Sequence, residues 1–475
     1  MYTAKYLKKA LLVSLLSFSL SANAELPELG DPTQQELTPF REYLMGKNFY
    51  RTLKANVPFI TDLEVNDYIN SLGKRLVSHS AKPEQTFRFF VIKVDSINAF
   101  AGPDAYIGFH TGLITEAENE SELAGVMAHE ISHVTQRHLA RAMTESSASP
   151  ATMFATILAG ILLASQNPDA GAALIYGGQA AFIQSQINFT RANEHEADRI
   201  GIGVLRDAGI NPQGMAGFFE TLLHKSESDN IFAQMEYLRT HPLNTTRIAE
   251  SINRISPEDQ HLPNDSLNFQ FARARVLVET SHSHQQLIKQ ILGLDKLQQN
   301  IVTKYTLGLA FLANQQADKA ITIFKQLSQE SAHPWVQLAL ADAYIEEQND
   351  KLAQQILRSL NTLYPNYMPV SIRYANLLVQ NKQSDEAISL LNSQLQSQKQ
   401  AVVYHSLAKA YYSKGEVSLA LEATSYEYEY EGYLKLAAQQ VTNALQQPGI
   451  NLMTTQRLEA RKRWLLEQIK REGKD

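Results

Sequence analysis

Apolar residues recur at helical spacing from about residue 25 to residue 82. Positions three or four residues apart share one face of a helix, and an apolar face predicts a helix that packs against a core. In "VNDYINSLGKRLVSH" that face consists of Val65, Ile69, Leu72 and Leu76. The sequence therefore predicts helices over this part of the chain.

The pattern changes between residues 87 and 114. "FRFFVIKV" and "AYIGFHTGLI" are rich in β-branched and aromatic residues, which favour strands. The segment "DSINAFAGPD" lies between them, and its glycine, proline and aspartate indicate a turn. We therefore expect a strand, a turn and a second strand.

A long helix should follow, capped by Asn119 or Ser121 and ending near Met143. Residues 151–187 then form two apolar stretches around "NPD" at 167–169, a pattern typical of a helical hairpin. Neither stretch is long enough to predict a membrane span. Two interpretations remain open: a hairpin buried in the core, or a lid or patch that touches a membrane or a client protein.

The second half of the chain repeats one helical template, after a polar stretch at residues 253–267. Spacings of 33, 34 and 33 residues separate Ala320, Ala353, Ala387 and Ala420. The same steps separate Ala310, Ala343, Leu377 and Ala410. A period near 34 with small residues at helix crossings resembles tetratricopeptide repeats, which stack into a curved solenoid whose inner groove binds peptides or proteins.

Composition narrows the class of protein. The 475 residues are 44% hydrophobic and 19% charged, which is enough to build ordinary cores in several domains. The formal net charge of −6 argues against general binding of nucleic acid. The absence of cysteine excludes disulfides, thiolate metal ligands and cysteine catalysis.

Residues 1–24 have the pattern of a secretory signal peptide. Lysines at positions 5, 8 and 9 precede an apolar run from Ala10 to Leu20, and "ANA" at 22–24 is a small-x-small cleavage site. The run is short for a bilayer span, and an uncleaved anchor is the alternative. Without cysteine the chain cannot be acylated as a bacterial lipoprotein. We therefore expect a soluble exported protein of the periplasm.

The segment "VMAHEISHVTQRH" contains two histidines four residues apart with a glutamate after the first. In a helix, His129 and His133 leave the same face about 40° apart, so both imidazoles can bind one metal ion. Glu130 lies about 100° from His129, where its carboxylate can take a proton from a metal-bound water and pass it to a leaving amine. Histidine is scarce, with 13 in the chain, so a chance match is uncommon.

Two protein ligands do not complete a stable site, and the same segment contains one further histidine. His138 lies five residues after His133, about 140° round the helix, and is expected to be an exposed polar residue. A metzincin-type third histidine would fall at position 139, which is Leu139. That class of metallopeptidase is therefore excluded.

A better candidate lies in "RANEHEADRIG". As a helix, this segment places Glu194 and Asp198 on one face and points Glu196 away from it. Glu194 can complete a catalytic site of two histidines and one glutamate, and Asp198 can accept a hydrogen bond from a ligand imidazole. An ordinary charged helix face is the alternative.

These segments, with "SINAFAGPDAYIGFHTGLI" and "LRTHPLNTTRIAE", resemble the gluzincin metallopeptidases, the family that includes the CAAX prenyl proteases and the HtpX-like membrane proteases. The resemblance covers most of residues 60–260. It implies one zinc ion per chain, bound by His129, His133 and Glu194, with Glu130 as the general base.

The resemblance also carries His241, in "THP", and Arg247. Such groups can stabilise the oxyanion of the tetrahedral intermediate. His241 can instead occupy the open position on the zinc and hold the enzyme latent, and a helix-capping residue is the plain alternative. The strand around Tyr106 to Thr111 is the candidate for pairing with an extended substrate, although its turn lacks the glycine pair common in the family.

We therefore expect an α+β, mostly α-helical fold. A zincin-type metallopeptidase domain with a small β-sheet should occupy residues 25–265, with residues 151–187 as a hairpin or lid. An all-α tetratricopeptide-repeat solenoid should occupy residues 266–475.

With its signal peptide and repeats, the chain is similar to periplasmic members of this family that act in quality control of outer-membrane β-barrel proteins. This implies a zinc endopeptidase, also a chaperone, that degrades misassembled or stalled outer-membrane proteins and contacts the β-barrel assembly machinery through its repeats. Residues 151–187 could touch the membrane surface, and no nucleic-acid partner is expected. The alternatives are a largely latent peptidase that acts as a scaffold, and a hydrolase of peptidoglycan or small peptides.

Overall fold

The computed structural model describes residues 37–145, 155, 158–159, 161–162, 180–228, 237–238, 241–243, 245–295 and 298–473. The predicted signal peptide and most of the apolar segment 151–187 lie outside the described residues. Within the described ranges, no helix has both the length and the apolar character needed to cross a bilayer.

A small mixed sheet consists of β1 (Arg88–Ile92), β2 (Ala99–Ala101) and β3 (Tyr106–His110). The strand order is β1-β3-β2, with β3 parallel to β1 and antiparallel to β2. β3 is therefore the central strand, and the prediction that the strand around Tyr106 to Thr111 offers a free edge to substrate is wrong. The segment interpreted as a turn contains β2, which is an edge strand.

The turn itself is η1 (Pro103–Ala105), a single 3-10 turn. Asp104 and Ala105 both adopt a positive φ, of 55° and 56°, which reverses the chain between β2 and β3. The pattern of "AFAGPD" favoured a turn because of its glycine and proline. A strand of three residues is too short to produce a recognisable alternation.

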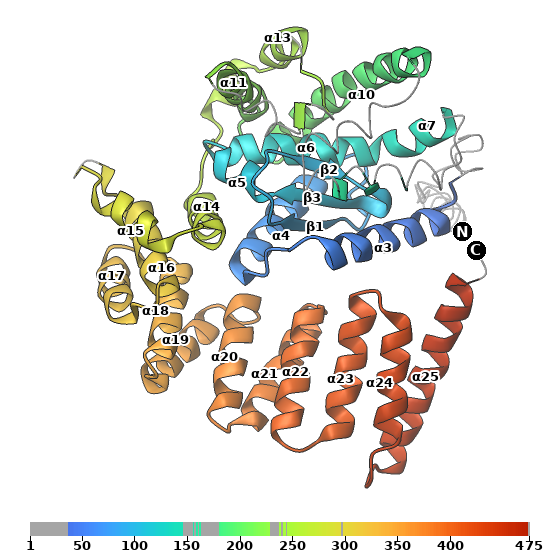
Figure 1. Ribbon diagram of the computed structural model, residues 1–475, viewed down its shortest axis with the longest axis vertical. Coiled ribbons are helices and arrows are strands. Elements are labelled where there is room, and N and C mark those ends of the chain that lie inside the picture. Colours follow the sequence, from blue (N-terminus) through green and yellow to red (C-terminus); the bar gives the residue numbers. More distant parts are fainter. Residues whose placement is uncertain are drawn as a thin grey trace, which may run out of the picture.

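The helices around the sheet are α3 (Pro39–Asn56), α4 (Leu63–Val77), α5 (Thr111–Glu116), α6 (Glu120–Thr135), α7 (His138–Glu145), α10 (Ala180–Asp207), α11 (Gln213–Ser228) and α13 (Thr245–Asn253). In Figure 1, α6 and α10 lie on one side of the sheet and α3 on the other.

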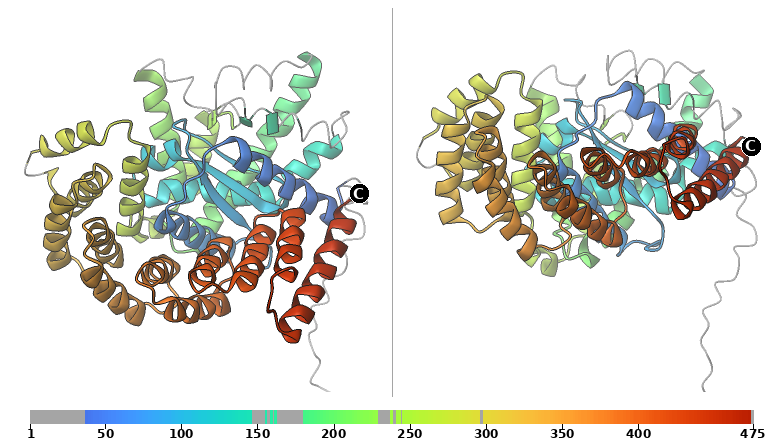
Figure 2. Two further views of the ribbon diagram at one scale, coloured as in Figure 1. Left: turned by 60° about the horizontal axis from the view of Figure 1, so that its bottom comes forward. Right: turned by 90° about the horizontal axis from the view of Figure 1, so that it is seen from below.

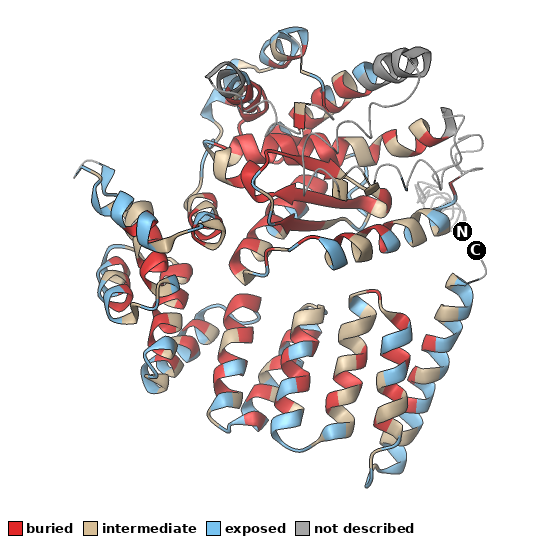
Figure 3. Cartoon of the chain, viewed as in Figure 1, coloured by how far each residue is buried: buried red, intermediate tan, exposed pale blue. Residues whose placement is uncertain are grey.

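Alternate residues of the strands divide between two apolar clusters, as the pleat of a strand requires. Phe90 and Tyr106 pack with Phe49 and other residues of α3. Phe89 and Phe109 belong to the main core with residues of α4 and α6. The sheet is therefore covered on both faces, and Figure 3 shows the strands and α6 as the most continuously buried part of the molecule.

The long helix predicted from residue 119 or 121 to about Met143 is two helices. The Asn119 side chain caps α6 by accepting a hydrogen bond from the backbone of Glu122 at 3.2 Å, as one of the two predicted alternatives required. α6 ends at Thr135, because Arg137 adopts a left-handed φ of 55°. No glycine or proline marks this position, so the helical pattern continued through it.

The second half is a series of paired helices that runs from left to right in Figure 1, from α15 to α25, and it is all helical in its described residues. Its members are α14 (Leu267–Thr280), α15 (His284–Leu292), α16 (Ile301–Ala313), α17 (Ala317–Glu330), α18 (Pro334–Glu346), α19 (Asp350–Leu363), α20 (Met368–Gln380), α21 (Ser384–Ser397), α22 (Ala401–Ser413), α23 (Val417–Tyr430), α24 (Leu434–Leu445) and α25 (Leu452–Glu472). The predicted register is confirmed by the complete burial of Ala320, Ala353, Ala387 and Ala420.

Figure 2 shows that the helical array curves around the sheet-containing half. Arg275 of α14, at its start, and Arg373 of α20, near its middle, both bind Glu64 of α4. At its far end, Glu472 of α25 pairs with Lys47 of α3. The concave side of the array thus lies against α3 and α4.

Candidate metal centre

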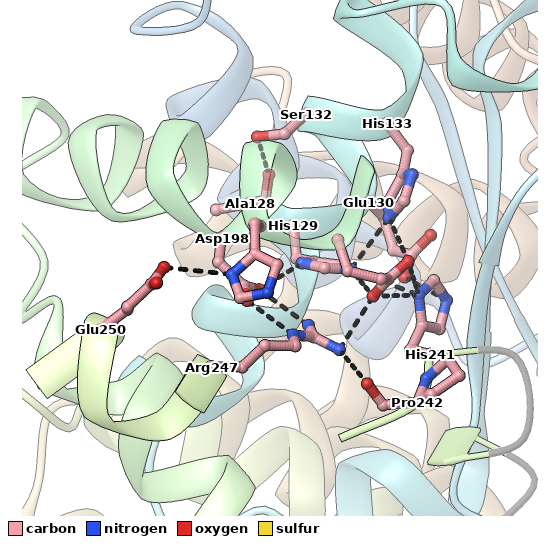
Figure 4. Close-up of polar contacts among 12 residues, drawn as sticks. Ala128, His129, Glu130, Ser132, His133, Asp198, His241, Pro242, Arg247 and Glu250 are labelled. Atoms are coloured by element: carbon pink, nitrogen blue, oxygen red, sulfur yellow. Dashed lines mark hydrogen bonds and ion pairs between the residues drawn. The ribbon is translucent and has the colours of Figure 1, made fainter. Parts of the chain in front are cut away.

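Four side chains offer metal-ligand atoms that all lie within 4.8 Å of one another: His129, His133, Glu194 and His241. Nε2 of His133 lies 2.9 Å from Nε2 of His129. The carboxylate oxygens of Glu194 lie 3.3 Å and 3.4 Å from these two nitrogens. Figure 4 shows the imidazoles of His129, His133 and His241 close to one another. Two imidazoles and one carboxylate are a donor set that suits a divalent metal ion.

Helix packing positions these donors. α6 places its two histidines one turn apart, as the spacing predicted, and α10 crosses α6 with Glu194 facing them. Gly201 of α10 makes this approach possible, because a Cβ atom there would lie 3.3 Å from the backbone of Ala128 and His129 and 2.8 Å from Met215. The distance between the two helices, and hence the third donor, depends on that glycine.

Asp198 and Arg247 hold the donors from outside. Nδ1 of His129 lies 2.9 Å from Oδ1 of Asp198 and donates a hydrogen bond to this carboxylate. The guanidinium of Arg247 binds both oxygens of Asp198, at 2.7 Å and 2.9 Å, and lies 3.0 Å from Glu194. Arg247 is 1% exposed, so its charge is matched by these two carboxylates within the protein.

Burial and neighbouring charges shift the pKa values of the buried donors in different directions. Burial lowers the pKa of His129, but Glu194 and Asp198 outweigh it and raise the pKa to about 10. Burial lowers the pKa of His133 to about 3. Burial raises the pKa of Glu194, but His241 and His129 more than offset it and lower the pKa well below its usual value. A divalent cation would satisfy this arrangement without any bound proton.

Glu130 lies beside the cluster at the end of a cavity. Its carboxylate is 1% exposed, and burial raises its pKa above the usual value. Its Oε1 lies 3.3 Å from Nε2 of His241, and the backbone N–H of Ala101 in β2 donates to the carboxylate. The cavity measures about 200 Å³ and is lined by Glu130, His133, His241, Phe100, Ala101, Gly102, Glu42, Val134, Arg137, His138, Leu139 and Ala140.

His138 is buried, which contradicts the prediction that it is an exposed polar residue. It is only 4% exposed, and its Nδ1 lies 2.7 Å from Nδ1 of His133. The prediction assumed a continuous helix, whereas the break at Arg137 turns His138 back toward the site. As predicted, His138 does not join the four donors; Glu196 also lies outside them, but it binds His138.

Tyr237 was missed by the sequence analysis. Its ring is fully buried and lies 4.6 Å from the ring of His241, measured between centroids. The backbone N–H of His241 donates to its carbonyl at 2.8 Å, a helical contact between residues four apart. That spacing in "YLRTH" is the signal that could have linked the two rings.

The fold and the site together define a metallopeptidase with a helical-repeat domain. Residues 64–254 match peptidase family M48, and residues 311–366 match the tetratricopeptide repeat. The beta-barrel assembly-enhancing protease of Escherichia coli is 36% identical over 402 residues, which cover 82% of each chain. That of Yersinia pestis is 35% identical over 396 residues, covering 80% of each. The mitochondrial metalloendopeptidase OMA1 of Arabidopsis thaliana is 31% identical over 157 residues, 33% of this chain and 29% of that protein.

The chain therefore belongs to the family of beta-barrel assembly-enhancing proteases, within peptidase family M48. The predicted family and the predicted fold, a metallopeptidase domain with a small sheet followed by helical repeats, are confirmed. The protein is a metalloprotease.

Proposed function

We propose that this chain is a periplasmic zinc endopeptidase that acts on outer-membrane β-barrel proteins during their assembly and degrades misassembled or stalled molecules. The names of its relatives support the substrate class. The observation that carries the proposal is the buried cluster of His129, His133 and Glu194 with Glu130 beside it, near the edge strand β2. An unfolded barrel strand is the kind of extended chain that such an edge can bind.

The edge strand β2 is the proposed binding surface for the substrate backbone. Its partner β3 occupies one side, and among the described residues no strand pairs with the other. Phe100, Ala101 and Gly102 line the cavity that also contains Glu130. A substrate strand added to β2 would therefore bring one of its carbonyl groups close to the donor cluster.

The residues of the cluster divide the chemistry between them. His129, His133 and Glu194 would hold the zinc ion, which would supply a Lewis acid for the peptide carbonyl and for water. Glu130 accepts the proton of the attacking water and delivers it to the leaving amine, and the raised pKa of this carboxyl suits both transfers. Asp198 holds His129 in the orientation that turns Nε2 toward the donors.

His241 has two proposed roles. Its Nδ1 lies 3.1 Å from Glu194 and 3.3 Å from Nε2 of His129, which supports a fourth, inhibitory position on the metal. If it moved away from the donors, its imidazole could stabilise the oxyanion instead. Arg247 is engaged by Asp198 and Glu194, so its distances favour a positioning role over direct contact with substrate.

We propose that the helical repeats bind client proteins and the β-barrel assembly machinery, because such arrays present extended surfaces to protein partners. The position of His241 among the four donors supports a second candidate function, in which the peptidase is largely latent and the chain acts as a chaperone or scaffold. Peripheral membrane contact through residues 151–187 remains a prediction from the sequence.

The Glu130→Gln variant tests the catalytic proposal. Glutamine keeps the shape of the side chain but cannot accept the proton, so we expect zinc binding to persist and peptide cleavage to fall about 10²–10⁴-fold. Trapped substrates, recovered from cells with the variant and identified by mass spectrometry, should be outer-membrane β-barrel proteins. Glu258→Gln, at an exposed position, is the matched control.

Two results would count against this function. If Glu130→Gln retains every cellular activity of the wild type, the scaffold alternative is correct. If the purified wild-type protein contains no zinc, the metal site itself is wrong.

A further inference from the structure

We propose that His138, Glu196 and Arg141 form a hydrogen-bonded chain that fixes the orientation and the tautomer of His133 as a metal ligand. This inference rests on the metal site proposed above and adds three residues to it. None of the three offers an atom to the donor cluster, so each is a positioning residue.

The distances define the chain step by step. Nδ1 of His138 lies 2.7 Å from Nδ1 of His133. Nε2 of His138 lies 3.1 Å from Oε2 of Glu196. Nη2 of Arg141 donates to the same carboxylate oxygen at 3.0 Å. These contacts therefore form a continuous hydrogen-bonded chain from His133 to Arg141.

Hydrogen-bond chemistry assigns the protons. Nε2 of His133 faces the donors, 2.9 Å from Nε2 of His129, so it must present its lone pair to a metal. The single proton of the neutral ring is then on Nδ1, and its partner at 2.7 Å is Nδ1 of His138. That nitrogen must accept, which leaves the proton of His138 on Nε2, where Glu196 can accept it.

The backbone at the end of α6 brings the three residues of this hydrogen-bonded chain together. The left-handed φ of Arg137 ends α6 and directs α7 back across it, so that His138 becomes 96% buried rather than exposed. Arg141 lies about one turn later on α7, and its guanidinium also binds the carbonyl of Gln136 at 2.7 Å and 3.0 Å, which fixes it in place. Glu196 comes from α10, on the other side of that helix from Glu194.

The two histidine ligands are thus supported in the same way. His129 donates to Asp198, which is held by Arg247. His133 donates to His138, which donates in turn to Glu196, a carboxylate held by Arg141. A hydrogen-bonded partner on the outer nitrogen makes an imidazole a stronger and better oriented ligand.

Two substitutions of His138 distinguish the loss of its hydrogen bond with His133 from a change in packing at this position. Asparagine places its side-chain oxygen near the position of Nδ1 and can still accept from His133, whereas leucine fills similar space without any acceptor. We expect His138→Leu to weaken zinc binding about 10–100-fold, measured by competition with a chelator, and His138→Asn to stay within a few-fold of the wild type. Asp259→Asn is the control for a loss of stability alone. It removes the salt-bridge partner of Arg206, which lies on α10 as Glu196 does.

The tautomer gives a second readout that does not depend on activity. Nitrogen-15 NMR of the zinc-loaded protein should show His138 protonated on Nε2 and unprotonated on Nδ1. A proton on Nδ1, or equal zinc affinity for wild type and His138→Leu, would overturn the proposed chain while leaving the zinc peptidase in place. A wild-type protein that binds no zinc would overturn both.

Discussion

At the scale of single residues, burial changes what a titratable side chain does. His110, at the end of β3, is 1% exposed, and its Nδ1 is bonded to the hydroxyl of Ser96 at 2.8 Å. Burial lowers the pKa of His110 to about 3. The ring is therefore neutral in the folded protein at any pH near neutrality.

This burial predicts an acid-dependent loss of stability. Below pH ~6.5 the unfolded chain binds a proton at His110 that the folded protein does not, so stability falls as the pH decreases. Between pH 6 and pH 4 this group alone should lower the free energy of unfolding by about 2–3 kcal/mol. Urea unfolding across that range should show a smaller decrease for His110→Gln than for the wild type. His79→Gln, at an exposed position, is the control, and equal slopes for all three proteins would refute the assignment.

At the scale of elements, the site depends on how closely helices approach α6. Gly214 of α11 faces the backbone of Ser121, and a Cβ atom there would lie 2.1 Å from its carbonyl carbon and oxygen. By contrast, a Cβ atom added at Gly203 of α10 would have no neighbouring atom within 4 Å. Gly214 therefore lies at a close contact between helices, whereas Gly203 does not.

Alanine substitutions should separate these two glycines. Gly214→Ala forces α11 away from α6 and should lower the free energy of unfolding by about 1–3 kcal/mol. Gly203→Ala should be neutral or stabilise the protein by up to ~1 kcal/mol, because alanine favours a helix more than glycine does. Denaturant midpoints measure both effects, and a Gly214→Ala variant as stable as Gly203→Ala would show that the helices can move apart freely.

At the scale of the whole molecule, buried charges join the two domains. Glu64 is fully buried in α4, 3.4 Å from Arg275 of α14 and 2.9 Å from Arg373 of α20. Asp62 completes the group by accepting from Arg275 at 2.7 Å. Burial raises the pKa of Asp62, but Arg275 outweighs this effect and lowers the pKa below its usual value. The repeats are therefore held to the peptidase domain by charges that water does not screen.

Removal of one charge should weaken this contact. Arg275→Met removes the arginine that binds Asp62 and leaves buried Glu64 with Arg373 alone, and it should cost about 3–5 kcal/mol of stability. Lys304→Met breaks the exposed pair with Glu330 and should cost less than ~1 kcal/mol. Urea unfolding compares the variants, and small-angle scattering reports whether the repeats separate from the peptidase domain. Equal stability of the two variants would mean that the buried charges do not join the domains.

The parts that the sequence determined are local or periodic. The spacing of His129 and His133 places both on one helix face whatever surrounds the helix, and the steps of 33 and 34 residues define the repeats. Glu194 and Asp198 could be paired with them because a helix places residues four apart together. These inferences needed only the geometry of a helix.

The parts that only the tertiary structure decided depend on a single dihedral angle or on packing between distant segments. The left-handed φ of Arg137 directs His138 away from solvent and toward the site. No residue type in this segment indicates that φ. The edge of the sheet lies at β2 because β3 pairs on both sides, a choice that strand patterns do not contain. The contacts of Arg247 with Glu194 and of Arg275 with Glu64 join segments far apart in the chain, where charge alone does not specify the partner.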